Sequence, residues 1–92
     1  KMFRENYNMS LIHAEEQEKE FYKKLGIALR NARRAAYKTQ TDVGQSINVT
    51  FHQIQKYEKA TNYPKEFRTR KMVEYLGRDY ETFLKENNVH TY

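Results

Sequence analysis

Hydrogen-bonding side chains recur along one face of the segment between residues 50 and 59. If this segment is a helix, a rotation of about 100° per residue places Ile54 and Tyr57 on one side. Lysine can donate to guanine O6 and N7, and histidine and glutamine can reach base edges or phosphates. The chemistry that this face suggests is recognition of a nucleic acid. The side chains opposite Ile54 or at the edge of that face are His52, Gln55, Lys56 and Lys59.

Positive charge is concentrated in residues 21–40. The chain has 17 basic and 12 acidic residues and a net charge of +5, yet this block holds six basic residues and no carboxylate. Such an excess is the electrostatic footprint of a phosphate-facing surface, and a solvated helix face is the alternative that charge alone leaves open. The six residues are Lys23, Lys24, Arg30, Arg33, Arg34 and Lys38.

Other chemistries find little support in the 92 residues. The chain has no cysteine, so it can form neither a disulfide nor a thiolate zinc site. His13, His52 and His90 are far apart and form no HxxxH pair, so no metal site is expected. A Gly-rich phosphate loop and a nucleophile motif are both absent. We therefore expect a single domain that is not an enzyme and needs no cofactor.

Hydropathy excludes a membrane protein. No run reaches the roughly 20 apolar residues that a spanning helix needs, and the first residues lack the apolar core of a signal peptide. We expect a cytoplasmic protein of a bacterium, or of a phage in a bacterial host.

Apolar residues recur at helical spacing and glycine and proline are scarce, which predicts an all-α fold. The expected helices span about 18–37, 40–46, 50–59 and 65–76, with a last short helix after Asp79. Thr39, Thr50 and Asp79 are good N-cap residues. The apolar face of the fourth helix is expected to comprise Phe67, Met72, Val73 and Leu76.

Residues 40–59 suit two short helices that cross at a steep angle. Val43 and Ile47 lie four apart on an inner face, and Gly44 lets the backbone approach closely. Asn48 stands in the turn, where a positive φ is needed and asparagine tolerates it. Glu58 is half inside, next to the apolar residues of the third helix, and therefore needs a charged partner.

These features resemble the phage repressor and Cro-type (XRE-like) family of helix-turn-helix DNA-binding domains. The resemblance covers about Leu25 to Leu76, and the string Gln53 to Lys59 is similar to that of repressor-like bacterial regulators. The chain departs from the family at Asn48 and Ala60, where glycine is usual, and at Tyr63, where a basic residue is common. Asn62 is the candidate for the left-handed conformation after the third helix. The other matching residues are Leu29, Arg33, Thr39, Gln40, Asn48, Tyr57 and Glu58.

The resemblance implies a five-helix repressor-like domain, with residues 40–59 as the helix-turn-helix unit and residues 50–59 in the major groove. It implies that Arg33 meets Glu58 and a phosphate together. Thr39 and Gln40 open a helix whose NH groups favour a phosphate oxygen, although capping alone would also explain Thr39. The expected DNA-binding residues are Arg33, Lys38, Thr39, Gln40, Thr50, Phe51, His52, Gln55, Lys56, Lys59, Asn62 and Tyr63.

Residues 1–17 read as an N-terminal extension, residues 18–87 as the domain and residues 88–92 as a tail. The extension is interpreted as an arm or an extra helix, with a disordered segment as the alternative. Two groups of apolar residues are candidates for contacts between subunits. They are Met9, Leu11 and Ile12 in the extension, and Tyr80, Phe83 and Leu84 near the end.

The sequence thus favours a transcription regulator that binds double-stranded DNA, at a palindromic operator, as a homodimer. The alternative is a protein-interaction module, antitoxin-like or adaptor-like, on a helix-turn-helix scaffold. In that case the acidic, partly apolar extension would bind a protein partner.

Overall fold

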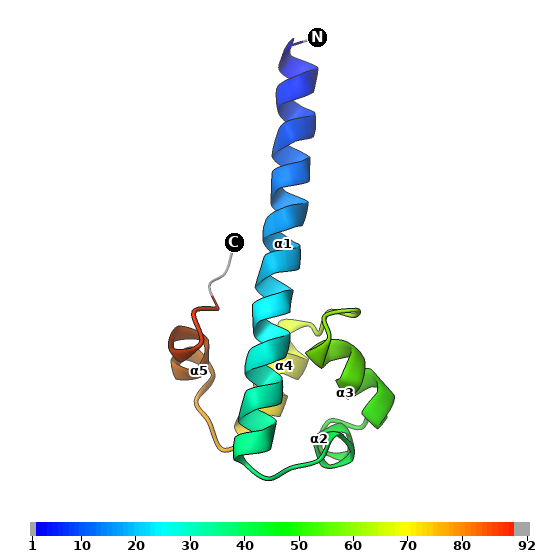
Figure 1. Ribbon diagram of the computed structural model, residues 1–92, viewed down its shortest axis with the longest axis vertical. Helices are drawn as coiled ribbons and strands as arrows, with labels where there is room; N and C mark the ends of the chain where they lie inside the picture. Colours follow the sequence, from blue (N-terminus) through cyan, green and yellow to red (C-terminus); the bar gives the residue numbers. More distant parts are fainter. Residues whose placement is uncertain (1, 90–92) are drawn as a thin grey trace.

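The computed structural model describes the backbone of residues 2–89 and the side chains of residues 13–89. Over this range the chain forms five α helices and no strand, which confirms the predicted all-α fold. Figure 1 shows how the helices are arranged. The helices are α1 (Met2–Ala35), α2 (Gln40–Ser46), α3 (Phe51–Glu58), α4 (Glu66–Tyr75) and α5 (Tyr80–Glu86).

Helix α1 is much longer than expected. It is continuous over 34 residues, so the prediction that the first helix starts near Glu18 is wrong, and the extension continues α1 instead of forming a separate element. Residues 1–20 contain no glycine or proline that would end a helix. The pairs Glu15 and Lys19, and Glu20 and Lys24, have the spacing that supports a helix across charged sequence.

The helix N-termini follow the predicted caps. The Thr39 hydroxyl accepts from the Asp42 backbone N–H, Thr50 caps α3 in the same way, and the Asp79 carboxylate accepts from the Thr82 N–H. Helix α4 differs, because Lys65 precedes it and gives no side-chain cap. Local capping chemistry thus accounts for three of the four short helices.

Each described helix ends in the same kind of turn, with a left-handed residue two positions after its last helical residue. Asn48 has φ 62°, as predicted. The expectation that Asn62 takes the left-handed conformation after α3 is wrong, because Ala60 takes it with φ 58°. The Ala60 and Thr61 N–H groups bond to carbonyl oxygens within α3, which fixes the turn there. The five left-handed residues are Tyr37, Asn48, Ala60, Gly77 and Asn88.

The core lies between the C-terminal half of α1 and the four short helices. Helix α3 packs against α1 and α2, and α4 packs against α1, α2 and α5. Phe67 was expected in this core and is 72% exposed, whereas Thr69 is buried and donates to the Lys65 carbonyl. The register of α4 thus turns the phenyl ring outward. The buried apolar residues are Leu25, Ala28, Leu29, Ala32, Val43, Ile54, Tyr57, Met72, Val73, Leu76, Tyr80, Phe83 and Val89.

The N-terminal half of α1 projects away from the other helices (Figure 1). The molecule measures 54 Å along its longest axis, and its radius of gyration of 15.3 Å exceeds the roughly 12 Å of a compact chain of this length. Within this projecting part, residues 13–17 have described side chains, and all five are exposed. The domain therefore carries a helical rod that its own core does not cover.

Candidate nucleic-acid interface

Two glycines allow α3 to sit close to its neighbours. A Cβ on Gly44 would lie 2.6 Å from the Val49 carbonyl oxygen, so the small residue predicted there is needed where α2 meets the start of α3. Gly26 does the same in α1, because a Cβ would lie 2.5 Å from the Glu58 carbonyl oxygen. Sequence reasoning missed Gly26, which carries no signal until α3 is placed against α1.

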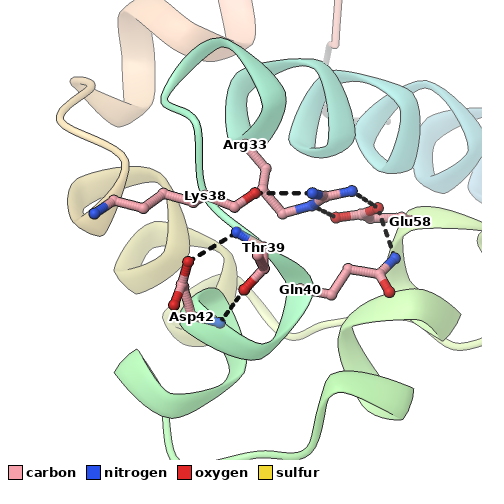
Figure 2. A network of polar contacts seen from close by, with 6 residues as sticks. All are labelled: Arg33, Lys38, Thr39, Gln40, Asp42 and Glu58. Carbon is pink, nitrogen blue, oxygen red and sulfur yellow. Dashed lines mark hydrogen bonds and ion pairs between the residues drawn. The ribbon is translucent and has the colours of Figure 1, made fainter.

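Arg33 and Glu58 form a two-pronged ion pair between α1 and α3, which Figure 2 shows. Arg33 Nε lies 2.6 Å from Glu58 Oε2, and Nη2 donates to Oε1 at 3.1 Å. The Arg33 side chain is 12% exposed and that of Glu58 is 5% exposed. Because both groups are largely removed from water, the pair fixes the direction of α3 relative to α1.

The network extends to the start of α2. Gln40 Nε2 donates to Glu58 Oε1 at 3.1 Å, and Arg33 Nη1 donates to the Lys38 carbonyl at 2.9 Å (Figure 2). The Glu58 carboxylate of α3 thus binds side chains of α1 and α2, and Arg33 connects this network to the loop between α1 and α2. A guanidinium has five N–H groups, so after these three bonds two N–H groups of Arg33 can still be donated to a phosphate.

Thr39 and Lys38 are engaged in local contacts. Thr39 and Asp42 form a capping box, and the hydrogen bonds from the Thr39 N–H and hydroxyl hold the pKa of Asp42 below its usual value. The Lys38 ammonium lies 5.6 Å from the centroid of the Tyr75 ring. Capping therefore accounts for the hydrogen bonds of Thr39, and Lys38 is exposed beside the Tyr75 ring.

The side chains expected to face outward on α3 lie mostly at the surface. His52, Lys56 and Lys59 are exposed, and Gln55 is half-buried. The opposite face is buried, with Ile54 at 1% exposure. The hydrogen-bonding side chains therefore point away from the core, along a single helix face.

At the start of α3, two aromatic rings lie side by side. Phe51 is 45% exposed, and its ring centroid is 4.0 Å from that of His52. The preceding Thr50 is exposed and its hydroxyl accepts from the Gln53 N–H. The phenyl ring thus stays open to solvent beside the exposed face of α3.

A basic hollow of about 480 Å³ adjoins this face, between the C-terminal part of α1, the start of α2 and the end of α3. Glu58 is the one carboxylate among the described side chains that line it, and that carboxylate is paired with Arg33. The hollow is therefore strongly electropositive and suited to anionic oxygen atoms. Its lining residues are Arg30, Arg33, Arg34, Lys38, Thr39, Gln40, Gln55, Glu58 and Lys59.

The loop after α3 is anchored to α1. The Tyr63 ring stacks on that of Tyr22, with centroids 4.2 Å apart and an interplanar angle of 4°. The exposed Asn62 accepts from the Tyr63 N–H. This stack, which sequence reasoning missed, draws Tyr63 toward the projecting part of α1 and away from the hollow.

The structure describes the side chains of only one of the two groups predicted to make subunit contacts. Tyr80 and Phe83 are buried in the core of their own chain, at 8% and 1% exposure, and Leu84 is half-buried against that core. These three residues of α5 therefore pack within their own chain. The other group, Met9, Leu11 and Ile12, belongs to the stretch of α1 whose side chains lie outside the described residues.

In the described part of the chain, the structure shows neither a metal site nor a membrane span. Among the described residues no three His, Asp or Glu side chains gather closely enough to hold a metal ion. Within the part of the chain that the structure covers, no helix combines the length and the apolar character needed to cross a bilayer.

Comparison with known protein families shows which family the chain belongs to. The helix-turn-helix domain family matches residues 24–83, which is more than half of the sequence. The chain therefore belongs to this family, as the resemblance to repressor and Cro-type domains implied, and domains of this class bind DNA. The family is typically not enzymatic. Comparisons with curated proteins and with solved structures found no match.

Proposed function

We propose that the chain is a sequence-specific, duplex DNA-binding transcription regulator that places α3 in the major groove. The observation that carries this proposal is the continuity between the donor-rich outer face of α3 and the basic hollow beside it. Base edges in the major groove are read by such donors, and phosphates fix the register of the protein on the duplex.

The roles within this surface follow from chemistry. Lys56 points away from the core, so it would donate to a guanine, while His52 and Gln55 would contact neighbouring base edges. Phe51 offers no hydrogen bond and would press on a thymine methyl group. Arg33, held by Glu58, would present its two remaining N–H groups to a phosphate.

Gln40, Lys38 and Lys59 would complete the phosphate contacts around the hollow. Thr39 and Thr50 would hold the helix starts in place through their caps. Asn62 and Tyr63 would reach the backbone only where the loop passes close to the duplex, since the Tyr63 ring is stacked on Tyr22.

A homodimer is part of the proposal. One helix of eight residues offers few base contacts, whereas two subunits can read half-sites about 34 to 36 Å apart. The projecting half of α1 is the element that the domain core leaves uncovered, which supports subunit contacts through residues 1–17.

Selection of binding sites from random duplexes tests the function directly. The proposal predicts enrichment of a palindromic consensus with half-sites about one helical turn apart, because a two-fold dimer imposes its symmetry on the DNA. Lys56→Ala with an otherwise unchanged chain should lose or alter one position in each half-site. Recovery of random sequence alone would overturn the proposal of a sequence-specific regulator.

A second candidate function has one observation in its favour. The rod that the N-terminal half of α1 forms projects from the domain and would bind another protein, as an antitoxin or adaptor does. Under this alternative, removal of residues 1–17 would abolish binding to a protein partner and leave DNA affinity unchanged. Under the regulator proposal the same truncation lowers operator affinity, because dimer formation is weakened.

A further inference from the structure

Three cations of α1 form a row that runs from the basic hollow toward the projecting half of the helix. Lys23, Arg30 and Arg34 are exposed and spaced by seven and four residues, which places them within about 40° of one another around the axis. Lys23, Arg30 and Arg34 together form the α1 basic row. At 1.5 Å per residue the row is about 16 Å long.

The row lies on the same side of α1 as α3. On a helical wheel it is next to Gly26, where the end of α3 approaches, and next to Arg33, which holds Glu58. Lys24, in contrast, lies about 100° farther round the helix than Lys23, away from α3. The row therefore shares a surface with the α3 interface.

A second hollow links the row to that interface. It measures about 460 Å³ and lies beside the end of α3, where Lys23 and Lys59 both line it. Lys59 also lines the basic hollow described above, so the two hollows share this side chain. The electropositive surface thus continues past α3 along α1.

The three cations of the row form no close ion pair with the described side chains. Over residues 13–89, none of the ion pairs closer than 4.0 Å involves Lys23, Arg30 or Arg34. Glu16, Lys19 and Glu20 also line the second hollow, and residues 15–20 hold four glutamates and one lysine, so the excess of positive charge ends there. The row is thus a short cationic strip that ends where the acidic part of α1 begins.

We propose that the α1 basic row binds the phosphate backbone of duplex DNA beyond the base pairs that α3 covers. This inference rests on the proposed function, since α3 must first bring α1 alongside the duplex. Each cation would neutralise one phosphate, and the acidic boundary would end the contact near Lys23. The row would extend the DNA footprint without adding sequence preference, because phosphates carry no direct sequence information.

The salt dependence of binding tests this inference on a duplex of arbitrary sequence, about 30 base pairs long, which always supplies flanking phosphates. The test variant is the full chain carrying Lys23→Gln and Arg30→Gln. The matched control carries Lys24→Gln and Lys85→Gln, which remove the same charge from exposed positions outside the row. Circular dichroism checks that both variants keep the helical content of the parent chain.

The inference predicts that the slope of log K against log salt becomes shallower by about 2 in the row variant, since two phosphate contacts are lost. The control should change the slope by much less. Equal changes in both variants would overturn the inference, because net charge alone would then explain the effect. Absence of binding by the parent chain at low salt would overturn it as well.

A second arm separates this inference from the proposed function. The selected half-site is compared with the same half-site extended by about ten base pairs on each side. The parent chain should gain affinity from the extension, and the row variant should not. If Lys56→Ala weakens binding but the extension adds nothing to the parent chain, the row proposal fails while the function stands. If selection yields no consensus, the function fails and the salt slopes still decide the row.

Discussion

Arg33 shows how one side chain can serve both stability and recognition. Its guanidinium joins α1 to Glu58 of α3 and to the loop before α2, while Gln40 bonds to the same carboxylate. The pair could be expected from the sequence, because a half-buried glutamate requires a partner and the family resemblance supplied an arginine. The contact with the Lys38 carbonyl depends on the path of the loop and could not be foreseen.

Arg33→Ala should lower the free energy of unfolding by about 2 to 3 kcal/mol, because Glu58 would remain buried with one neutral donor. The change should also weaken binding to specific and random DNA alike, since α3 loses its anchor and a phosphate loses a donor. Urea denaturation and DNA titration measure the two effects. For the unfolding measurement alone, Arg34→Ala at an exposed neighbouring position is the control, and it should leave the unfolding midpoint nearly unchanged. An unaltered midpoint for Arg33→Ala would show that the pair contributes nothing.

The left-handed residue after α3 gives a second prediction at this scale. Ala60 has φ 58°, a conformation that strains a residue with a Cβ, so Ala60→Gly should stabilise the fold by about 0.5 to 1 kcal/mol after the added chain entropy is subtracted. Gly77→Ala is the reciprocal control, since φ there is 79° and no atom lies within 4 Å of the added Cβ. It should lower the melting temperature as Ala60→Gly raises it. A lower melting temperature for Ala60→Gly would contradict the explanation.

Among the elements, the starts of the three helices with side-chain caps were predictable, and tertiary register was not. The helix starts at Thr39, Thr50 and Asp79 could be predicted because N-capping depends only on residues close in sequence. The outward turn of Phe67 and the stack of Tyr63 on Tyr22 depend on how whole helices pack, which no local signal encodes. The start of α1 was missed because residues 13–20 are mostly charged or polar and lack the apolar periodicity used to find helices.

The close approach of α1 and α3 predicts the effect of Gly26→Ala. The added methyl would overlap the Glu58 carbonyl, so α3 must shift, and we expect a loss of about 1 to 2 kcal/mol after the gain in helix propensity is subtracted. DNA affinity should fall too, since α3 carries the reading face. Thermal melts and DNA titration measure both effects.

Asn31→Ala serves as the control for Gly26→Ala, because it makes a change to alanine at an exposed position of the same helix. It should be neutral or slightly stabilising. A Gly26→Ala variant as stable as this control would mean that α1 and α3 are less closely packed than described.

At the scale of the whole molecule, the proposal gives DNA binding to the domain and subunit contacts to the rod formed by the N-terminal half of α1. The core cluster runs from Leu25 to Val89, so deletion of residues 1–17 should leave a cooperatively folding helical domain with nearly unchanged melting behaviour. If residues Met9, Leu11 and Ile12 join two subunits, sedimentation equilibrium should show a weaker dimer, because three large apolar side chains are lost from each protomer. A truncated chain that dimerises as strongly as the parent would contradict contacts through the rod.

The central claim is that the outer face of α3 reads base pairs, and Lys56→Ala tests it most directly. Affinity is measured at one salt concentration on the selected operator and on random duplex, for the parent chain, for Lys56→Ala and for Lys24→Ala as a charge-matched control. We predict a loss of about 1 to 3 kcal/mol on the operator, with relaxed preference at one base pair of each half-site and a smaller loss on random duplex. Equal losses on both duplexes, or no loss on the operator, would contradict the claim.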